Sequence, residues 1–297
     1  MSQTDLTNGR VSTALARLTA PMMMGVSSSI LVQVLEMGFI GQLSTAHVAA
    51  ITFTFPLTMV LTSIALGISI GTSSVIARSV GQQSRSKSYT DDVQRLGTHS
   101  LVLVTVAMSL LAALCWFSLD VLFIALGASP EMLPLIHSYL DIYLPGSIFF
   151  TASMILGSIM RANGSATTPG VVMTVGSLIH LLLDPIFIFG WFGMPAMELT
   201  GAATAMTVTR FGTLIVIMIF VWKRQMILRG DHFRAFFEST RRILHVGLPA
   251  IATNLIGPIT AAYITRLMAS YGETAVAGFG VAGRIESVAA MLMFALS

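Results

Sequence analysis

The sequence predicts an all-α polytopic membrane protein. Hydrophobic residues make up 55% of the 297-residue chain and charged residues only 10%, whereas about 25% of the residues of soluble domains are charged. The apolar runs are about 20 residues or longer, the length of a helix that crosses a bilayer, and they lack the alternation of barrel strands. Because lipid offers the backbone no hydrogen-bond partners, the spans should be helices.

Eight apolar segments are predicted, separated by groups of turn-forming residues such as Ser44–Thr45, Gly127–Pro130 and Asn163–Gly164. The predicted segments cover residues 17–42, 46–77, 98–125, 132–160, 169–190, 200–222, 245–269 and 274–297.

Lys and Arg residues are concentrated in every second break, which predicts the orientation of the chain. They surround the second break, mark the fourth and crowd the sixth, and the main exception is Arg266. By the positive-inside rule these ends face the cytoplasm. The N-terminus should therefore be cytoplasmic in an inner or plasma membrane. We interpret the basic residues as topology signals and contacts with anionic lipid, so no nucleic-acid partner is expected.

A weak internal repeat divides the chain. At an offset of 228 residues, Pro21 aligns with Pro249, Val48–Ala49 with Val276–Ala277, and Ser69 with Ser297. Such repeats frame a central site in many transporters. We expect a six-helix lobe over 1–222, a cytoplasmic inter-lobe loop over 223–244, and the first two helices of a second lobe over 245–297. The chain would then be a fragment of a protein of about 450 residues.

Three ionisable residues inside the spans are candidate functional groups. Glu36 lies within LVQVLEMGFIGQL, at 31–43, and a charge at that depth costs roughly 3 kcal/mol. With a rise of 1.5 Å per residue, Glu36 and Asp184 lie about 9 and 10 Å below the same membrane surface, so they could share a cavity. His180 precedes Asp184 by one helical turn. The group could relay protons, or Glu36 and Asp184 could hold Na⁺.

Purely structural roles for these three residues are the alternative. Glu36 could lie at a helix end and reach water, His180 could be a core histidine bonded to Asp184, and Asp184 could fix the turn before Pro185.

Other ionisable residues are weaker candidates. Asp141 and Asp120 lie in the outer halves of their segments, where they can reach water. Arg210, Arg284 and Glu286 are expected to form structural ion pairs with other spans. Gly67 and Gly71 have the spacing of a helix-packing motif.

Several classes of protein are disfavoured by missing motifs. The sequence contains no nucleotide-binding loop, metal-ligand spacing or nucleophile motif, so we expect neither an enzyme nor a cofactor. The single cysteine, Cys115, excludes an internal disulfide framework and a Cys-rich metal site.

Seven short stretches, spread over nearly the whole chain, carry a resemblance to a known family: FIGQLS (39–44), ARSVGQ (77–82), SIMRANGSATTP (158–169), DPIFIFG (184–190), GAATA (201–205), GLP (247–249) and RIE (284–286). In their residues, order and spacing they resemble the multidrug and toxic compound extrusion (MATE) family. The resemblance implies twelve helices in two six-helix lobes that export organic cations in exchange for Na⁺ or H⁺.

The resemblance also implies roles for single residues. Glu36 falls at the coupling acid of helix one, where the family usually has Asp, and Asp184 matches the acid that opens the helix-five motif. His180 stands where one subgroup often has Asn. Another subgroup carries Glu on helix seven, but the region from Asn254 to Pro258 has no acid, which favours coupling through the first lobe. Asp141 replaces a residue that is often basic.

Our leading hypothesis is a secondary antiporter for organic cations and drugs, with H⁺ favoured over Na⁺ and a monomer expected at full length. A lipid-linked precursor flippase of the same superfamily is the first alternative. It should have basic residues inside the lobe cavity, where the sequence suggests mainly acids. A non-transporting membrane scaffold or receptor is the second, and it would not need titratable acids at matched depth.

Overall fold

The computed structural model describes residues 11–81, 89–227 and 235–296, and within these ranges the chain is helical, with no strand. The prediction of an all-α protein is confirmed. The helices are α1 (Val11–Gly41), α2 (Thr45–Gly81), α3 (Tyr89–Phe117), α4 (Leu119–Ala125), α5 (Leu133–Ala162), α6 (Thr167–Phe189), α7 (Glu198–Lys223), α8 (Phe236–Asn254), α9 (Ile256–Ala269) and α10 (Glu273–Leu296), with a 3-10 turn, η1 (Trp191–Gly193), after α6.

Seven stretches of the described residues are long and apolar enough to cross a membrane, and α8 and α9 together form one of them. The eighth predicted segment, 274–297, forms α10 up to Leu296, and Ser297 lies outside the described residues. The chain is therefore a multi-pass membrane protein.

Two predicted segments differ most from the structure at their edges, although α1 also begins before the predicted residue 17 and α2 ends after the predicted residue 77. The third was predicted over 98–125, but α3 begins at Tyr89 and the helix breaks at Ser118. The seventh was predicted from 245, but α8 begins at Phe236 and a break at Leu255 separates it from α9. The early starts were missed because these first turns carry charged residues. The break at Leu255 was missed because the run remains apolar through it.

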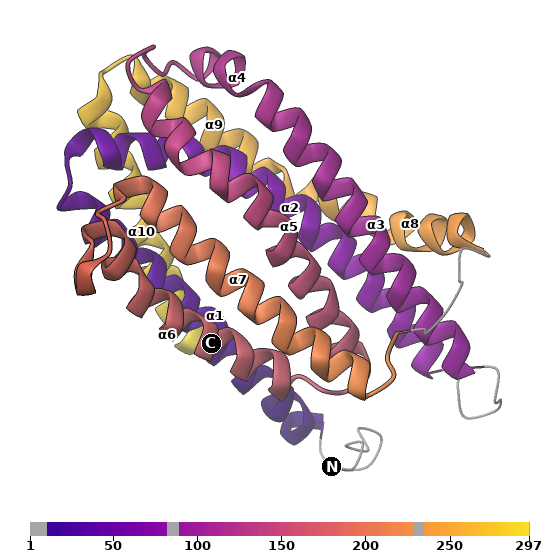
Figure 1. Cartoon of the computed structure of the whole chain (residues 1–297). Helices are drawn as coiled ribbons and strands as arrows, with labels where there is room; N and C mark the ends of the chain where they lie inside the picture. The colour runs from indigo at the N-terminus through magenta and orange to yellow at the C-terminus, as the bar shows by residue number, and fades with distance from the viewer. Residues whose placement is uncertain (1–10, 82–88, 228–234, 297) are drawn as a thin grey trace.

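The helices alternate in direction, which gives the bundle two different ends (Figure 1). We call the end where α2, α5 and α7 finish the basic end, because it holds the described cations Arg78, Arg95, Arg161, Lys223, Arg224, Arg241 and Arg242. The opposite end, which we call the turn end, holds the α1–α2 turn, α4, η1 and the α9–α10 turn. The two-sided pattern of Lys and Arg is thus present in the fold.

The packing of the helices leaves a ring around an internal space. Helix α1 packs on α6, α6 on α7, α7 on α5, and α5 on α2. Helix α2 also contacts α3, α8, α9 and α10, so it joins the first six spans to the last two. Large apolar side chains point outward from α3, α6 and α7, among them Leu110, Leu182 and Phe211. This outer surface suits lipid rather than water.

The Gly67 and Gly71 pair packs closely against another helix, as predicted. A Cβ atom at Gly71 would collide with the carbonyl oxygen of Ile243, and one at Gly67 would lie 2.8 Å from the backbone nitrogen of Ile251. Gly247 of α8 faces both positions. The absence of side chains therefore lets the backbones of α2 and α8 touch.

Candidate functional site

A cavity of about 410 Å³ lies inside the ring and is lined by α1, α2, α5, α6 and α7, with one residue from α10. Its lining residues recur every three or four positions along each helix, because such residues share one helix face. On α1 these are Gln33, Glu36 and Ile40, and on α6 they are Met173, Gly176 and His180. Hydroxyl, aromatic and methionine side chains make up most of the wall.

Glu36, His180 and Asp184 meet at one side of this cavity. One carboxylate oxygen from each acid and one imidazole nitrogen all lie within 4.8 Å of one another. All three residues are buried, and the side chain of Asp184 is fully so. Glu36 and His180 line the cavity, while Asp184 lies one helical turn further along α6, outside the lining. The structure thus brings the three predicted residues together.

The polar atoms of this acid cluster are poorly satisfied by the protein. The Nε2 atom of His180 lies 3.1 Å from Oδ1 of Asp184, within ion-pair distance. However, neither atom makes a well-aligned hydrogen bond with the described residues, nor do the second oxygen of Asp184 and Oε1 of Glu36. Buried polar groups are nearly always paired. A buried cluster with free acceptors can therefore accept a proton or a cation.

Two arginines also face the cavity, and neither forms the structural ion pair that the sequence suggested. The guanidinium of Arg210 lies between two aromatic rings, 4.7 Å from the centroid of Tyr143 and 4.8 Å from that of Phe150. Its Nη1 atom is buried and makes no hydrogen bond with the described residues. The expectation of a structural ion pair is wrong for Arg210, because aromatic faces hold its charge instead.

Arg284 enters the same cavity from α10. Its Nη1 atom donates a hydrogen bond to the side-chain oxygen of Gln33 on α1 at 2.6 Å, and its guanidinium lies 5.0 Å from the ring centroid of Phe55 on α2. The predicted ion pair is replaced here by an amide acceptor and an aromatic face. The expectation of mainly acidic groups in the cavity is also wrong, since two arginines line it alongside Glu36.

The remaining weaker candidates lie away from the cavity lining. Glu286 is exposed on α10. The side-chain amide of Asn254 donates to the carbonyl oxygen of Ala250 at 2.7 Å, and the Asn254 carbonyl accepts a hydrogen bond from Ser63 at 3.1 Å. Asn254 therefore helps to hold the α8–α9 break against α2.

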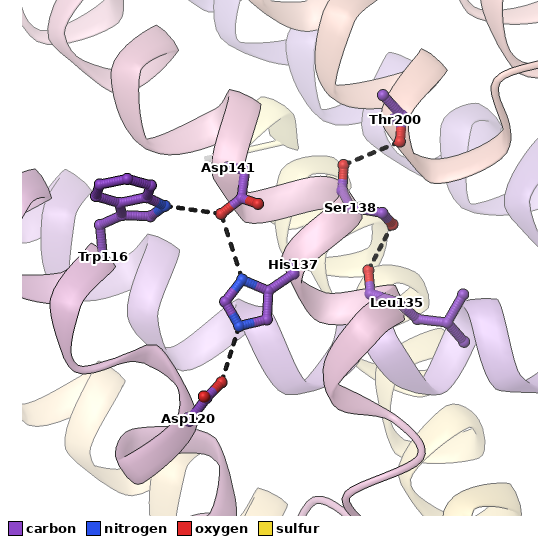
Figure 2. Close-up of polar contacts among 7 residues, drawn as sticks. All are labelled: Trp116, Asp120, Leu135, His137, Ser138, Asp141 and Thr200. Carbon is purple, nitrogen blue, oxygen red and sulfur yellow. Dashed lines mark hydrogen bonds and ion pairs between the residues drawn. The ribbon is translucent and has the colours of Figure 1, made fainter.

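Asp141 takes part in a polar cluster at the turn end, shown in Figure 2. His137 lies between two acids, with Nε2 at 2.8 Å from Asp120 and Nδ1 at 3.4 Å from Asp141. The indole nitrogen of Trp116 donates to Asp141 at 2.9 Å. These contacts tie α3, α4 and α5 together, and the exposure of both acids fits the expectation that they reach water.

Sequence reasoning missed the aromatic wall that holds Arg210. Tyr139, Tyr143 and Phe150 are spaced by four and seven residues on α5, which places them on one helix face. Arg210 itself lies about 18 Å along α7, near the middle of the span. That spacing, combined with an arginine at mid-span, was the available signal.

Comparison with known proteins agrees with the resemblance. The MatE family model matches residues 21–186. The FAD transporter of Shewanella oneidensis is 32% identical over 301 residues, a match that covers 98% of this chain and 64% of the relative. The multidrug export protein MepA of Staphylococcus aureus is 26% identical over 287 residues, covering 95% of this chain and 61% of MepA.

A solved structure shows the same arrangement of helices. A crystal structure of a mutant form of the Vibrio cholerae MATE transporter VcmN matches with a TM-score of 0.80 and 29% identity, over 95% of this chain and 62% of VcmN. The chain thus spans somewhat more than three fifths of the length of these relatives. Because the MatE family model matches more than half of the residues of this chain, the chain belongs to the MatE family.

Proposed function

We propose that this protein is a secondary antiporter that moves small organic compounds across the membrane in exchange for protons, coupled through Glu36, His180 and Asp184. The observation that supports this best is a buried cluster of two carboxylates and an imidazole that opens onto a cavity and lacks aligned hydrogen bonds. An intramembrane ionisable residue that faces a cavity is expensive to keep and usually serves transport.

In this proposal Glu36 is the group that gains and loses the coupling proton. It lies on the cavity wall, where a proton can arrive from water and where a substrate can contact it. His180 and Asp184 form an ion-pair contact behind it and can share or pass on that proton. Protonated Glu36 would hold a cationic substrate weakly, and ionised Glu36 would hold it strongly, so the two ligands exclude each other.

The composition of the cluster favours H⁺ over Na⁺. Hard cations prefer several oxygen ligands, whereas this cluster supplies oxygen from only two side chains and its third donor is a nitrogen. An imidazole accepts and releases protons near neutral pH.

Replacing Glu36 by Gln tests the coupling role. Export of a fluorescent dye from cells that express the gene for this chain should fall to background, because Gln cannot exchange a proton. Membrane insertion should be unaffected, since an intramembrane charge is removed. Glu286→Gln, which removes an exposed acid outside the cavity, is the matched control and should leave export unchanged. Undiminished, pH-dependent export by Glu36→Gln would contradict the proposal.

Organic cations are the first substrate class that the cavity suits. The carboxylate of Glu36 would attract a cation, and the rings of Phe55 and Tyr139 and the side chains of Met37 and Met206 offer apolar and aromatic surface. The name of the relative MepA, a multidrug export protein, is in line with this class.

Arg210 favours a second substrate class, compounds that carry an acidic group as well as an aromatic body. Its buried, unpaired nitrogen could donate to a carboxylate or phosphate, and the rings of Tyr143 and Phe150 fix its orientation. The relative named FAD transporter has a name that fits such a compound. Basic residues in the cavity were also the feature expected of a flippase for lipid-linked precursors.

Three dyes and two variants can separate these classes. Riboflavin and flavin mononucleotide share a ring system and differ in one phosphate, and ethidium is a planar cation. If Arg210 holds an acidic group, the purified chain in lipid nanodiscs should bind the phosphate compound about 10- to 100-fold more tightly than riboflavin, the range of a charge-assisted hydrogen bond.

Arg210→Gln should remove that difference, and Arg210→Lys should keep part of it. Arg266→Gln, which removes an exposed arginine on α9, is the control and should change nothing. Equal binding of the two flavins by the unmodified chain, with tight binding of ethidium, would contradict the acidic class and favour organic cations.

A further inference from the structure

A second hollow lies at the basic end of the bundle, between the end of α2 and the start of α8. Its volume is about 270 Å³. Helix α8 packs against α2 and α3, and Figure 1 shows its start projecting past α3. We call this hollow the seam pocket, and it is lined by Val75 and Arg78 of α2 and by Arg241, Arg242, His245 and Val246 of α8.

The ionisable residues that line the seam pocket are all basic, and Glu238, one helical turn before Arg241 and Arg242, lies outside the lining. Three arginines and a histidine line it, and none of its lining residues is acidic. Within the described parts of the chain, the guanidinium groups of Arg78, Arg241 and Arg242 make no hydrogen bond or ion pair. Like charges that face each other across two helices repel, and an anion between them would remove that repulsion.

The packing beside the pocket keeps these charges close together. Gly71 lies two turns before Arg78, and it contacts the α8 backbone at Ile243 and Gly247. Ile243 is fully buried next to Arg242. Because backbones that touch cannot move apart without losing this contact, the arginines of α2 and α8 are held around the same space.

The position of the pocket selects the kind of anion. It lies at the end of the spans that the positive-inside rule assigns to the cytoplasm, where the headgroups of the inner leaflet would surround these spans. Basic pockets between transmembrane helices at this level bind the phosphates of anionic lipids. Arginine suits this task because its planar fork can donate two hydrogen bonds to one phosphate.

We propose that the seam pocket binds the phosphate of an anionic phospholipid, which bridges Arg78 of α2 and the arginines of α8. The lipid would lie where the first six spans meet the last two, and it would stabilise the packing of α2 against α8 at the basic end. Loss of the lipid would leave the cations facing one another and loosen this contact.

The test uses the purified chain in a neutral detergent after its lipids have been removed. Phosphatidylglycerol, phosphatidylcholine and inorganic phosphate are added separately, bound lipid is counted by native mass spectrometry, and thermal unfolding is followed as each is titrated. Phosphatidylglycerol should be retained and should raise the unfolding temperature, whereas phosphatidylcholine should do neither. Equal stabilisation by inorganic phosphate, with no lipid retained, would overturn the assignment to lipid.

Variants locate the site. Arg241→Gln should weaken phosphatidylglycerol binding about fivefold, since each basic residue near the surface contributes roughly that much, and the double variant with Arg78→Gln should weaken it further. Lys223→Gln removes a cation at the same end but outside the pocket and should leave binding unchanged.

A variant that combines Arg78→Lys with Arg241→Lys keeps the positive charge at both positions. It should therefore still retain the lipid, even if the Gln variants fail to fold. Equal losses in Arg241→Gln and Lys223→Gln would show a general effect of charge and overturn the site. Loss of lipid in a folded Lys variant would show that positive charge at these two positions does not hold the lipid, and would also overturn it.

Discussion

The buried ionisable groups set the character of the cavity at the scale of single residues. Each unpaired polar atom that is buried costs the fold about 1–3 kcal/mol, and Glu36, His180, Asp184 and Arg210 all carry such atoms. Groups that are kept at this cost are candidates for the role in transport proposed above. The cavity is lined by both acidic and basic groups, with Glu36 on α1 and arginines on α7 and α10, and Asp184 of α6 lies behind the lining.

In this cluster, His180 is the residue for which a role in proton transfer is easiest to distinguish from a purely structural role. His180→Asn removes the group that can carry a proton but keeps a polar side chain. If the imidazole passes protons, export by cells that express this variant should lose most of its pH dependence around neutrality, where imidazole titrates. Dye efflux across a pH series measures this. An unchanged pH profile together with a lower unfolding temperature would show that His180 only supports the fold.

Close contact between helices controls the fold at the scale of elements. The α8–α9 break shows how side chains compensate for a lost backbone bond. Pro258 has no N–H to donate to the carbonyl of Asn254 four residues earlier, and the hydroxyl of Ser63 on α2 donates to that carbonyl instead. The middle of α8 is thus fixed on α2 by the glycine contact, and its last residue by this hydrogen bond.

A pair of glycine substitutions tests the contact between α2 and α8. Gly71→Ala should destabilise the chain by about 1–3 kcal/mol, because the new methyl group would be forced against the carbonyl oxygen of Ile243. Gly38→Ala in α1 meets no atom within 4 Å, and alanine is the better helix former by about 1 kcal/mol, so this control should be neutral or stabilising. Thermal unfolding of both variants in detergent measures the difference. A Gly71→Ala variant as stable as Gly38→Ala would contradict the close packing.

The hydropathy of the sequence and the positions of its prolines and glycines were enough to predict where most spans lie, because these properties act locally. They failed where α3 and α8 extend beyond the apolar runs, since turns rich in charge can be helical at a membrane surface. Counting residues inward from the membrane surface predicted that Glu36 and Asp184 lie close together, because both depths were counted from the same surface. It could not place Arg284 beside Gln33, since that contact joins residues 251 positions apart and depends on how α10 packs.

The predicted internal repeat can be compared with the burial of its residues at the scale of the whole molecule. Val48 and Ala49 are buried in α2, and their repeat partners Val276 and Ala277 are buried in α10. Glu36 has no acidic counterpart, since the repeat places Ile264 there. At these positions the burial pattern thus repeats between the two halves, whereas the acid at position 36 does not. This asymmetry agrees with coupling through the first lobe.

The direction of the whole bundle in the membrane is the last property to test. The cations at the basic end predict that this end faces the cytoplasm. Two exposed positions can report this orientation, Gln42 at the turn end and Lys223 at the basic end.

Each of these two residues is replaced by cysteine after the buried Cys115 has been changed to alanine. A membrane-impermeant maleimide added to intact cells should label Gln42→Cys, and should label Lys223→Cys only after the membrane is opened. The parent without cysteine should stay unlabelled under both conditions. Labelling of Lys223→Cys in intact cells, with none at Gln42→Cys, would reverse the orientation and move the seam pocket to the outer surface.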